Sequence, residues 1–438
     1  MTFGTVCGTK RAAIIVHAKT MINFKISPKI GFVTAGYLSI VGTSTFAGGF
    51  DLPDQDAFAV ARGLAVVATA DNPAAIFYNP AGLTQLTGNN LEAGFYGIYL
   101  DPQYTPPGGG NTFHNQEPFG GVPQLFYVHG NEKQTFSYGL GVYAPSGLSV
   151  RWQDNARLRT AGVQGSLEQI AINPVVAFKL LDSLSIGGGL SANYANLDLR
   201  QGIAWPNQPY DQFRFQGDGW GLSGNVGLLW KPLEQLSFGA SLHTGTKINL
   251  KGYTSAYNNQ LGIPGYPEFS TSASAQADFQ FPLKAEAGFS YRPTPKWNLE
   301  FDVDYTDWNS MGTVNIQQAH GVPGLFPQNI ALPLEWKSSW YYELGATRYF
   351  DNGWHVSAGY IFNQNAVPDA NYNTVVADEN RHFFSVGVGH KGKQLDFDVA
   401  YQFGYGPDRT VNGSVNPAAN GTYGFISHAV AVSVGWHF

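Results

Sequence analysis

The 438-residue chain contains a single cysteine, Cys7, and few charged residues. Charged side chains make up 13% of it, about half of the ~25% that is usual in a globular protein. Since we expect Cys7 to lie in a segment that is removed, the mature chain would contain no disulfide and no thiol-ligated metal. A chain without cysteine suits a compartment in which stray thiols are oxidised.

Long hydrophobic runs are also missing. The mean hydropathy is −0.16, and no segment after residue 47 approaches the roughly 18 consecutive apolar residues of a membrane-spanning helix. A chain of this kind can live in a membrane only as a closed β-barrel, in which every backbone polar group finds its partner in a neighbouring strand.

Acidic residues are absent before residue 48. That segment holds five of the 25 basic side chains, which leaves 20 basic against 31 acidic side chains in the rest of the chain. This acidic balance argues against nucleic-acid binding, which requires a basic face.

The same segment predicts a secretory signal peptide that begins at Met21. Its features are, in order, Lys25 and Lys29, the apolar residues 30–42 and a small-residue cleavage site at 45–47. The mature chain would begin near Gly48, and residues 1–20 would be an upstream extension or part of a longer signal peptide, so the start codon stays open between Met1 and Met21. A transmembrane anchor is the alternative, but the apolar run is shorter than the ~20 residues that span a bilayer.

Aromatic residues, at 14%, and 53 glycines are abundant. From Leu91 onward apolar and polar residues alternate with the period of two that is typical of β-strands. Fourteen candidate strands result, each close to the ~9–11 residues that cross a bilayer at a tilt. They are residues 91–101, 122–130, 134–144, 166–180, 184–199, 217–231, 236–250, 272–292, 297–308, 336–350, 354–363, 379–390, 394–404 and 423–438.

The alternation gives each strand two different faces. In the ninth candidate, Leu299, Phe301 and Val303 share one face, while Glu300 and Asp302 share the other. In a soluble sandwich the apolar face would pack into a core. In a membrane barrel it would face lipid, and the charged face would line the lumen.

The connections between strands decide between these alternatives, because they alternate between short and long. The short ones are residues 131–133, 181–183, 232–235, 293–296, 351–353 and 391–393, and the long ones are 102–121, 145–165, 200–216, 251–271, 309–335, 364–378 and 405–422. This rhythm is typical of a bacterial outer-membrane barrel with an even number of strands. We therefore predict an all-β fold, a 14-stranded antiparallel transmembrane β-barrel built from residues 91–438.

Residues 48–90 differ from the rest and predict an N-terminal hatch, a plug inside the lumen. Two Asn-Pro-Ala triplets, at residues 72–74 and 79–81, restrain the backbone into a compact knot. Before them, residues 56–70 carry apolar side chains at helical spacing.

Three segments resemble the FadL family of outer-membrane transporters for long-chain fatty acids and aromatic hydrocarbons. They are residues 70–84, which contain DNPAAIFYNPAGL, residues 138–148 and residues 173–190. The resemblance implies a barrel of the predicted kind, closed by a hatch. It also implies that extracellular loops capture a hydrophobic small molecule, which enters the barrel and leaves sideways through a gap made by an inward kink in strand 3.

The resemblance also implies which residues of the hatch gate this path. They are Asn79, Pro80 and Ala81, together with Asn72 and Pro73, and we expect Asn79 to contact the kinked strand.

The kink itself would fall at Gly139, Gly141 and Pro145, since glycine weakens a strand and proline removes a hydrogen-bond donor. The family often has Pro-Phe-Gly where this chain has Ala144-Pro145-Ser146-Gly147, which leaves the geometry of the following loop open.

Two pairs of loop residues are candidates for substrate binding. Arg157 and Arg159 would attract a substrate carboxylate, and Leu325 with Phe326 would form a first apolar docking site. Salt bridges within the loop, or binding of anionic lipopolysaccharide, are the alternatives for the arginines. Packing of loop on loop is the alternative for the apolar pair.

The chain ends on Phe438, which resembles the C-terminal signature that the barrel-assembly machinery of the outer membrane recognises. We therefore expect this machinery, outer-membrane lipid and lipopolysaccharide as partners.

Enzymatic motifs are absent, including Gly-x-Ser-x-Gly, His-Glu-x-x-His and a phosphate-binding glycine loop. We interpret the lumenal Asp302, Asp304, Asp396 and Asp398 as parts of a water-facing wall, and the histidines lack ligand spacing. No catalytic residue, metal or cofactor is therefore expected. Passive uptake of hydrophobic compounds is the leading hypothesis. The alternatives are a general porin, a structural or adhesion-related barrel, and an outer-membrane hydrolase.

Overall fold

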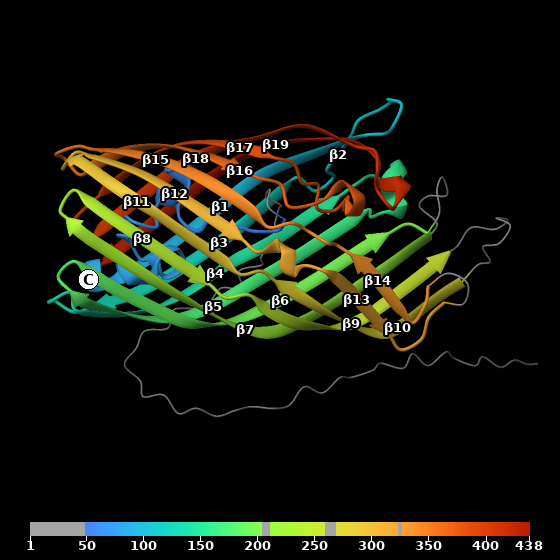
Figure 1. The fold of residues 1–438 in the computed structure, drawn as a ribbon, viewed down its shortest axis with the longest axis horizontal. Helices are drawn as coiled ribbons and strands as arrows, with labels where there is room; N and C mark the ends of the chain where they lie inside the picture. The colour runs from blue at the N-terminus through green and yellow to red at the C-terminus, as the bar shows by residue number, and fades with distance from the viewer. Residues whose placement is uncertain (1–48, 204–210, 259–268, 323–325) are drawn as a thin grey trace, which may run out of the picture. The chain divides into compact units, whose positions relative to one another are not determined.

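The fold is known from a computed structural model, which describes residues 49–203, 211–258, 269–322 and 326–438. These residues lie within one unit, Ile40–Phe438. The expected signal peptide, the expected mature start at Gly48 and the candidate residue Leu325 lie outside the described residues. Figure 1 shows long, tilted strands running side by side, with the first described segment, in blue, enclosed by them.

The described elements are two short α-helices, five short 3₁₀-helices (η1 to η5) and nineteen strand segments. They are α1 (Ala57–Ala61), α2 (Ala75–Tyr78), η1 (Pro80–Gln85), β1 (Gly88–Thr105), β2 (Phe113–His114), β3 (Phe119–Gly130), β4 (Phe136–Arg151), η2 (Arg157–Thr160), β5 (Gln164–Leu181), β6 (Leu184–Gln201), β7 (Asp211–Leu233), β8 (Leu236–His243), β9 (Thr246–Asn258), β10 (Phe269–Phe281), β11 (Lys284–Thr294), β12 (Trp297–Thr306), η3 (Trp308–Ser310), β13 (Thr313–Gln318), β14 (Asn329–Pro333), β15 (Ser339–Tyr349), β16 (Trp354–Asn363), η4 (Asp369–Asn371), β17 (Arg381–Lys391), β18 (Leu395–Val411), η5 (Pro417–Ala419) and β19 (Gly421–His437).

The nineteen strand segments form fourteen wall strands. β8 and β9 are two halves of one wall strand, since both pair with β7, and the same holds for β10 with β11, β12 with β13 and β14 with β15. β2 is a short addition beside β1. β1 pairs antiparallel with β3 on one side and with β19 on the other, which closes the barrel. The predicted 14-stranded antiparallel barrel is confirmed.

The two faces of the wall follow the alternation in the sequence. In β12, Asn298, Glu300 and Asp302 are buried against the lumen, whereas Trp297 and Leu299 are 41% and 42% exposed on the outside. An apolar outer face beside a polar inner face is what a barrel surrounded by lipid requires.

Residues 49–87, which we call the hatch, fill the space that the wall surrounds, and α1, α2 and η1 are buried there. Polar side chains cap the N-termini of α1 and η1. The Asp56 carboxylate accepts a hydrogen bond from the Ala59 N–H at 3.1 Å, and the Asn79 side chain accepts one from the Ala81 N–H at 3.2 Å. Nowhere in the described chain is a helix long and apolar enough to cross a membrane.

The helical spacing at residues 56–70 overestimates the helix, which ends at Ala61. Gly63 and Leu64 have φ angles of 62° and 65°, in the left-handed region, so the chain turns there. The turn brings the hatch against β16, where a Cβ atom on Gly359 would lie 2.0 Å from the Gly63 nitrogen. Close packing of hatch on wall therefore overrides the helical pattern.

Charged side chains join the hatch to the wall. Arg62 is fully buried, and its guanidinium lies 2.9 Å from the Glu300 carboxylate on β12. The same carboxylate accepts hydrogen bonds from the backbone N–H groups of Ala68 and Thr69, and Asp302 accepts one from Val67 at 2.8 Å. One ion pair thus organises a whole turn of the hatch.

Replacing Arg62 by methionine removes this pair and leaves Glu300 buried without its counter-ion. Breaking a buried pair from one side costs about 3–5 kcal/mol, so we expect backbone amides 57–70 to exchange their hydrogens at least 100-fold faster. Hydrogen–deuterium exchange with peptide resolution measures this rate.

Arg151→Met is the matched control, because Arg151 pairs with Glu117 at 3.1 Å while both side chains are more than two-fifths exposed. Such a pair contributes at most about 1 kcal/mol. Equal exchange in Arg62→Met and Arg151→Met would contradict an organising role for Arg62.

Candidate functional site

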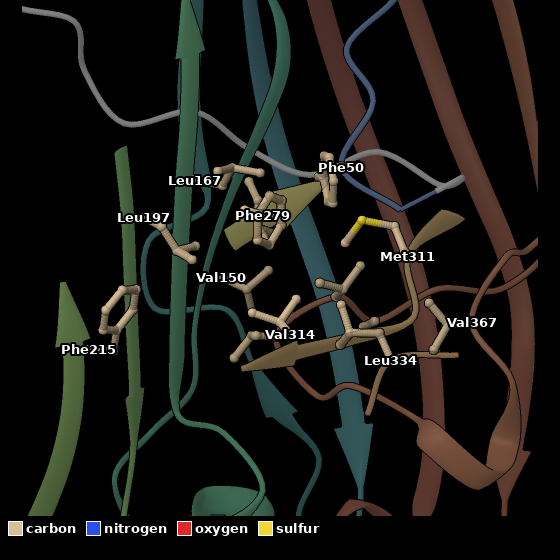
Figure 2. Packing of buried hydrophobic residues seen from close by; sticks show 14 of the residues in the cluster. Phe50, Val150, Leu167, Leu197, Phe215, Phe279, Met311, Val314, Leu334 and Val367 are labelled. Carbon is tan, nitrogen blue, oxygen red and sulfur yellow. The ribbon is translucent and has the colours of Figure 1, made fainter. Parts of the chain in front are cut away.

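An apolar cavity of about 220 Å³ lies between the long-loop end of the wall and the loops above it. Its lining comes from β4 to β7, β10, β13 and β14 and from the loops that follow η2 and β14, precede β17 and join β18 to β19. Figure 2 shows buried hydrophobic side chains of this region, among them Leu167, Phe215 and Phe279, which converge from several strands. Those that line the cavity include Leu148, Leu167, Leu197, Phe215, Phe279, Val314 and Leu334.

Phe50, at the start of the hatch, closes this cavity on one side. It is 1% exposed and packs edge-on against Trp308, with 4.7 Å between the ring centroids. Gly49 has a φ of 76°, and a Cβ atom there would lie 2.7 Å from Trp308 and 2.8 Å from Trp336. Only glycine at this position lets the chain pass between the two indoles.

Arg200 is the one charged side chain among the described residues that line the cavity. Its guanidinium lies 2.8 Å from the Asp198 carboxylate, which also pairs with Arg214 at 2.7 Å. Two guanidinium groups thus share one carboxylate, and Arg200 is engaged.

The loop before β17 contributes Val375 and Val376 to the cavity. At its end, burial raises the pKa of Glu379 to about 7, against the opposing effect of Arg381, whose Nε lies 3.0 Å from the Glu379 carboxylate.

The wall is interrupted between β3 and β4. β3 pairs with β1 along its whole length, Phe119–Gly130, but it pairs with β4 only from Leu125 to Gly130. β4 continues to Arg151, and its ladder with β5 shifts register between Tyr143 and Ser146. Pro123 and Pro145 both lie at this break, and neither has a backbone N–H to donate.

Hatch residues take the place of β3 along this part of β4. The Leu52 N–H donates to the Pro145 carbonyl at 3.0 Å, and the Gly147 N–H donates to the Phe50 carbonyl at 2.9 Å. Asp51 and Ser146 form the antiparallel bridge between them. The Gln55 side chain donates to the Ala144 carbonyl at 2.7 Å. Residues 50–52 therefore touch both the cavity and the break in the wall.

Asp54 follows this segment and is buried inside the barrel. Burial raises its pKa to about 7, although a hydrogen bond from Gln402, 3.2 Å away, favours the ionised form. Its backbone carbonyl accepts from Gln124 on β3, so this residue joins the hatch to β3 and to β18.

The kinked strand of the sequence analysis is β4 in the structure. The expectation that Asn79 contacts it is wrong for the Asn79 side chain. The Asn79 amide donates to the Val67 carbonyl at 2.7 Å and to the Leu228 carbonyl on β7 at 3.0 Å. A Cβ atom on Gly227 would lie 2.1 Å from its oxygen. The amide nitrogen thus donates to the hatch backbone and to β7, and the amide oxygen accepts from the Ala81 N–H, all away from β4.

Ile76 meets the kinked strand instead, one turn before Asn79. Cβ atoms on Gly139 and Gly141 would each lie 2.9 Å from the Ile76 side chain. These glycines therefore make room for the hatch, and the break lies at the other end of the predicted range, at Pro145.

The remaining hatch candidates lie within the plug. The Asn72 amide donates to the Asp56 carboxylate at 2.8 Å. Pro73, Pro80 and Ala81 are buried, and a Cβ atom on Gly187 of β6 would lie 2.5 Å from the Pro80 carbonyl.

The loop candidates fall in two different environments. Arg159 is 2% exposed, and its guanidinium forms a buried ion pair with Asp211 and donates to the Asp211 carbonyl at 2.9 Å. Arg157 is exposed on the same 3₁₀ turn, η2. Phe326 stacks on Phe213, which lines the cavity, with 4.4 Å between the ring centroids.

Three of the four lumenal aspartates pair with a basic side chain, and the fourth, Asp302, accepts a hydrogen bond from the Val67 N–H. Asp304 lies 3.3 Å from Lys284, Asp396 lies 2.7 Å from His437, and Asp398 lies 2.7 Å from His355. At the chain end, the Phe438 N–H and carbonyl pair with the backbone of Asn89, at 3.0 and 3.1 Å.

Sequence reasoning missed Phe50 and Arg62. Arg62 is the one basic residue between Gly48 and Asn90, and a lone cation in an apolar segment is a signal that could have been used. Nothing in the sequence around Phe50 distinguishes it from other aromatic residues.

Comparisons with known proteins agree with this architecture. Residues 38–438 match the family model described as "Outer membrane protein transport protein (OMPP1/FadL/TodX)". The chain is 24% identical over 442 residues to the long-chain fatty acid transport protein of Escherichia coli K12, covering 92% of this chain and 96% of that protein.

Two solved structures share the fold. A Pseudomonas aeruginosa FadL homologue superposes with a TM-score of 0.77 at 19% identity, covering 89% of this chain and 100% of that one. The Pseudomonas putida toluene transporter TodX superposes with a TM-score of 0.70 at 17% identity, covering 89% and 99%.

Proposed function

This chain belongs to the OMPP1/FadL/TodX family of outer membrane transport proteins, and we propose that it takes up small neutral hydrophobic molecules passively, through the apolar cavity and sideways through the β3–β4 break. As a member of that family it is an outer-membrane transporter of hydrophobic compounds and not an enzyme. The observation that carries the proposal is the double role of residues 50–52, which close the cavity and complete the wall.

The size of the cavity favours a small substrate. A cavity of about 150 Å³ lined by Leu, Ile and Phe can hold one benzene molecule, and the volume here is about 220 Å³. One monoaromatic ring fits such a space, as does the end of an acyl chain. TodX is a toluene transporter, and the relative from E. coli transports long-chain fatty acids.

The charge of the cavity favours a neutral substrate. Arg200 already pairs with Asp198, so a carboxylate that entered would have to share that guanidinium with an existing partner. A fatty acid would leave its carboxylate among the loops, where Arg157 is exposed on η2 and nearby Ala161 lines the cavity.

The lateral path follows from the backbone contacts of the hatch. Phe50 forms part of the cavity, and the next two residues occupy the β4 edge at Pro145 and Ser146. If residues 50–52 leave this edge, the cavity opens toward the break in the wall. The substrate then passes from water to lipid down its own partition gradient, so the path needs no coupled energy source.

A general porin is the alternative, and the hatch argues against it. Porins keep a water-filled lumen, whereas the hatch packs directly on the wall here. Pro80 faces Gly187 of β6, and Gly63 faces Gly359 of β16, without room for a Cβ atom at either glycine.

A disulfide between hatch and break tests the path. In a chain with Cys7→Ser, the double variant Asp51→Cys with Ser146→Cys places two thiols on bridged residues of an antiparallel pair, which suits a disulfide. We expect oxidation to reduce uptake of labelled toluene at least tenfold, and reduction by dithiothreitol to restore it, because the bond holds residues 50–52 on β4.

Thr84→Cys with Ser185→Cys is the matched control. Their hydroxyl oxygens lie 2.7 Å apart, so this disulfide fixes the end of the hatch to β6 and leaves residues 50–52 free to move. Its oxidation should not change toluene uptake. Full transport in the oxidised Asp51–Ser146 variant would rule out the lateral path.

Substitutions at the two loop arginines should distinguish a role in recognising a carboxylate from a role in folding. We expect Arg157→Gln to lower uptake of labelled oleate several-fold and to spare toluene, because only oleate carries a carboxylate. Arg159→Gln should lower both equally, since it leaves Asp211 buried without its partner, at a cost of about 3–5 kcal/mol. Initial rates in whole cells measure both. A parallel loss of oleate and toluene uptake in Arg157→Gln would contradict carboxylate attraction at that residue.

A further inference from the structure

Three carboxylates meet on the lumenal face of the wall, where it lies against the hatch. Glu286 on β11, Asp302 on β12 and Glu343 on β15 each offer one oxygen, and these oxygens lie within 4.8 Å of one another. Asp302 and Glu343 are directly opposite each other in the β12–β15 ladder. Glu286 is opposite Asp304 in the β11–β12 ladder, which places it diagonal to Asp302.

Such an arrangement is unfavourable if nothing neutralises it. Like charges directly opposite in a sheet destabilise it, and here Asp302 is 0% and Glu343 is 3% exposed. Burial strengthens the repulsion because the local dielectric constant is low.

The neighbouring basic side chains are engaged with other carboxylates. Lys284 lies 2.7 Å from Asp51 and 3.3 Å from Asp304, and Arg62 lies 2.9 Å from Glu300. Both cations lie near the cluster, but their ion-pair partners are Glu300, Asp51 and Asp304, and neither forms an ion pair with the three carboxylates.

Two oxygens of the cluster are buried and unsatisfied. Asp302 Oδ1 and Glu343 Oε2 have no hydrogen-bond partner within the part of the chain that the structure describes. The other oxygen of Asp302 accepts from the Val67 N–H of the hatch at 2.8 Å. A buried oxygen without a donor needs an explanation, and a bound ion is one that satisfies several such oxygens at once.

A small cavity beside the cluster offers space for that group. Its volume is about 20 Å³, and two of the three carboxylates, Glu286 and Glu343, line it together with Tyr78, His243, Asp304 and Lys284. A volume of roughly 10–15 Å³ suffices for one water molecule, and a bare metal ion is no larger.

The spacing of the oxygens fits a hard cation. Calcium binds oxygen ligands at about 2.3–2.6 Å, so two oxygens on one calcium ion lie at most roughly 5 Å apart. Zinc prefers nitrogen and sulfur ligands, and magnesium demands near-ideal octahedral geometry and retains its waters. Carboxylates fixed on three strands suit calcium better than either.

We propose that Glu286, Asp302 and Glu343 bind one calcium ion between the barrel wall and the hatch. The ion joins β11, β12 and β15, and through Asp302 it supports the hatch turn at Val67. The sequence predicted no metal site because its three ligands are far apart in the chain, and only the strand register brings them together. This site is independent of the transported substrate.

Calcium binding to the purified full chain in detergent micelles tests the proposal. After removal of metal with EDTA, isothermal titration with calcium chloride should show one site per chain, and calcium should raise Tm by several degrees. Glu343→Gln should weaken this site at least tenfold. In EDTA the same variant should melt at a higher temperature than the wild type, because one repelling charge has gone.

Glu92→Gln is the matched control, since Glu92 is a buried lumenal carboxylate on β1 outside the cluster. It should bind calcium as the wild type does. Calcium held by co-purified lipopolysaccharide is unaffected by either substitution and so cancels in the comparison.

Three results would overturn the proposal. One is a Glu343→Gln variant that binds calcium as tightly as the wild type does. Another is a wild type whose Tm does not respond to calcium, which would mean that the carboxylates share protons instead. The third is a magnesium response at lower concentration than the calcium response.

Discussion

Backbone hydrogen bonds between the hatch and β4 are the interaction on which the rest of the structure depends. Beyond Val142, β4 has no ladder with β3, and each unpaired backbone group in a lipid-facing wall costs on the order of a few kcal/mol. Phe50 and Leu52 supply partners to Gly147 and Pro145. The wall is complete only while these hatch residues lie on it, so their movement would open the wall and the cavity together.

Interactions with charged side chains hold a later part of the hatch, residues 62–69, in place on the wall. Arg62 and the carboxylates of β12 hold the turn at residues 67–69, while glycines on β6 and β16 let the backbone approach closely. The first residues of the hatch are held by backbone bonds to β4, by Gln55, by the packing of Phe50 on Trp308 and by the ion pair of Asp51 with Lys284. The two parts of the hatch therefore use different contacts, and residues 50–52 are the part that lies on the β4 edge.

The barrel could be predicted from the sequence because its signals are local. Alternation within a strand such as 297–307 and the rhythm of the loops need no knowledge of distant residues. Contacts between hatch and wall join residues that are far apart in the chain. The sequence therefore predicts a contact of Asn79 with β4, whereas its side chain bonds to β7. The end of α1 at Ala61 likewise depends on close packing against β16.

The same limit applies to the candidate site. Proline and glycine located the break near Pro145, but the partner that fills it, Phe50–Leu52, has no motif of its own. Arg159 carries the same charge as Arg157, and only the structure separates them, since Asp211 pairs with one of the two. Side-chain type thus predicts which charges and backbone breaks the site can contain. Which residues pair with one another depends on the fold.

Photolabelling with a diazirine-bearing toluene analogue in outer membranes tests the lateral path most directly. Mass spectrometry should find labels on cavity residues such as Leu148 and Phe279, and then on both edges of the break, at Pro123 and Pro145. Labels that pass through the lumen to the short-turn end, at Gln85 and Lys231, with none at the break would contradict it.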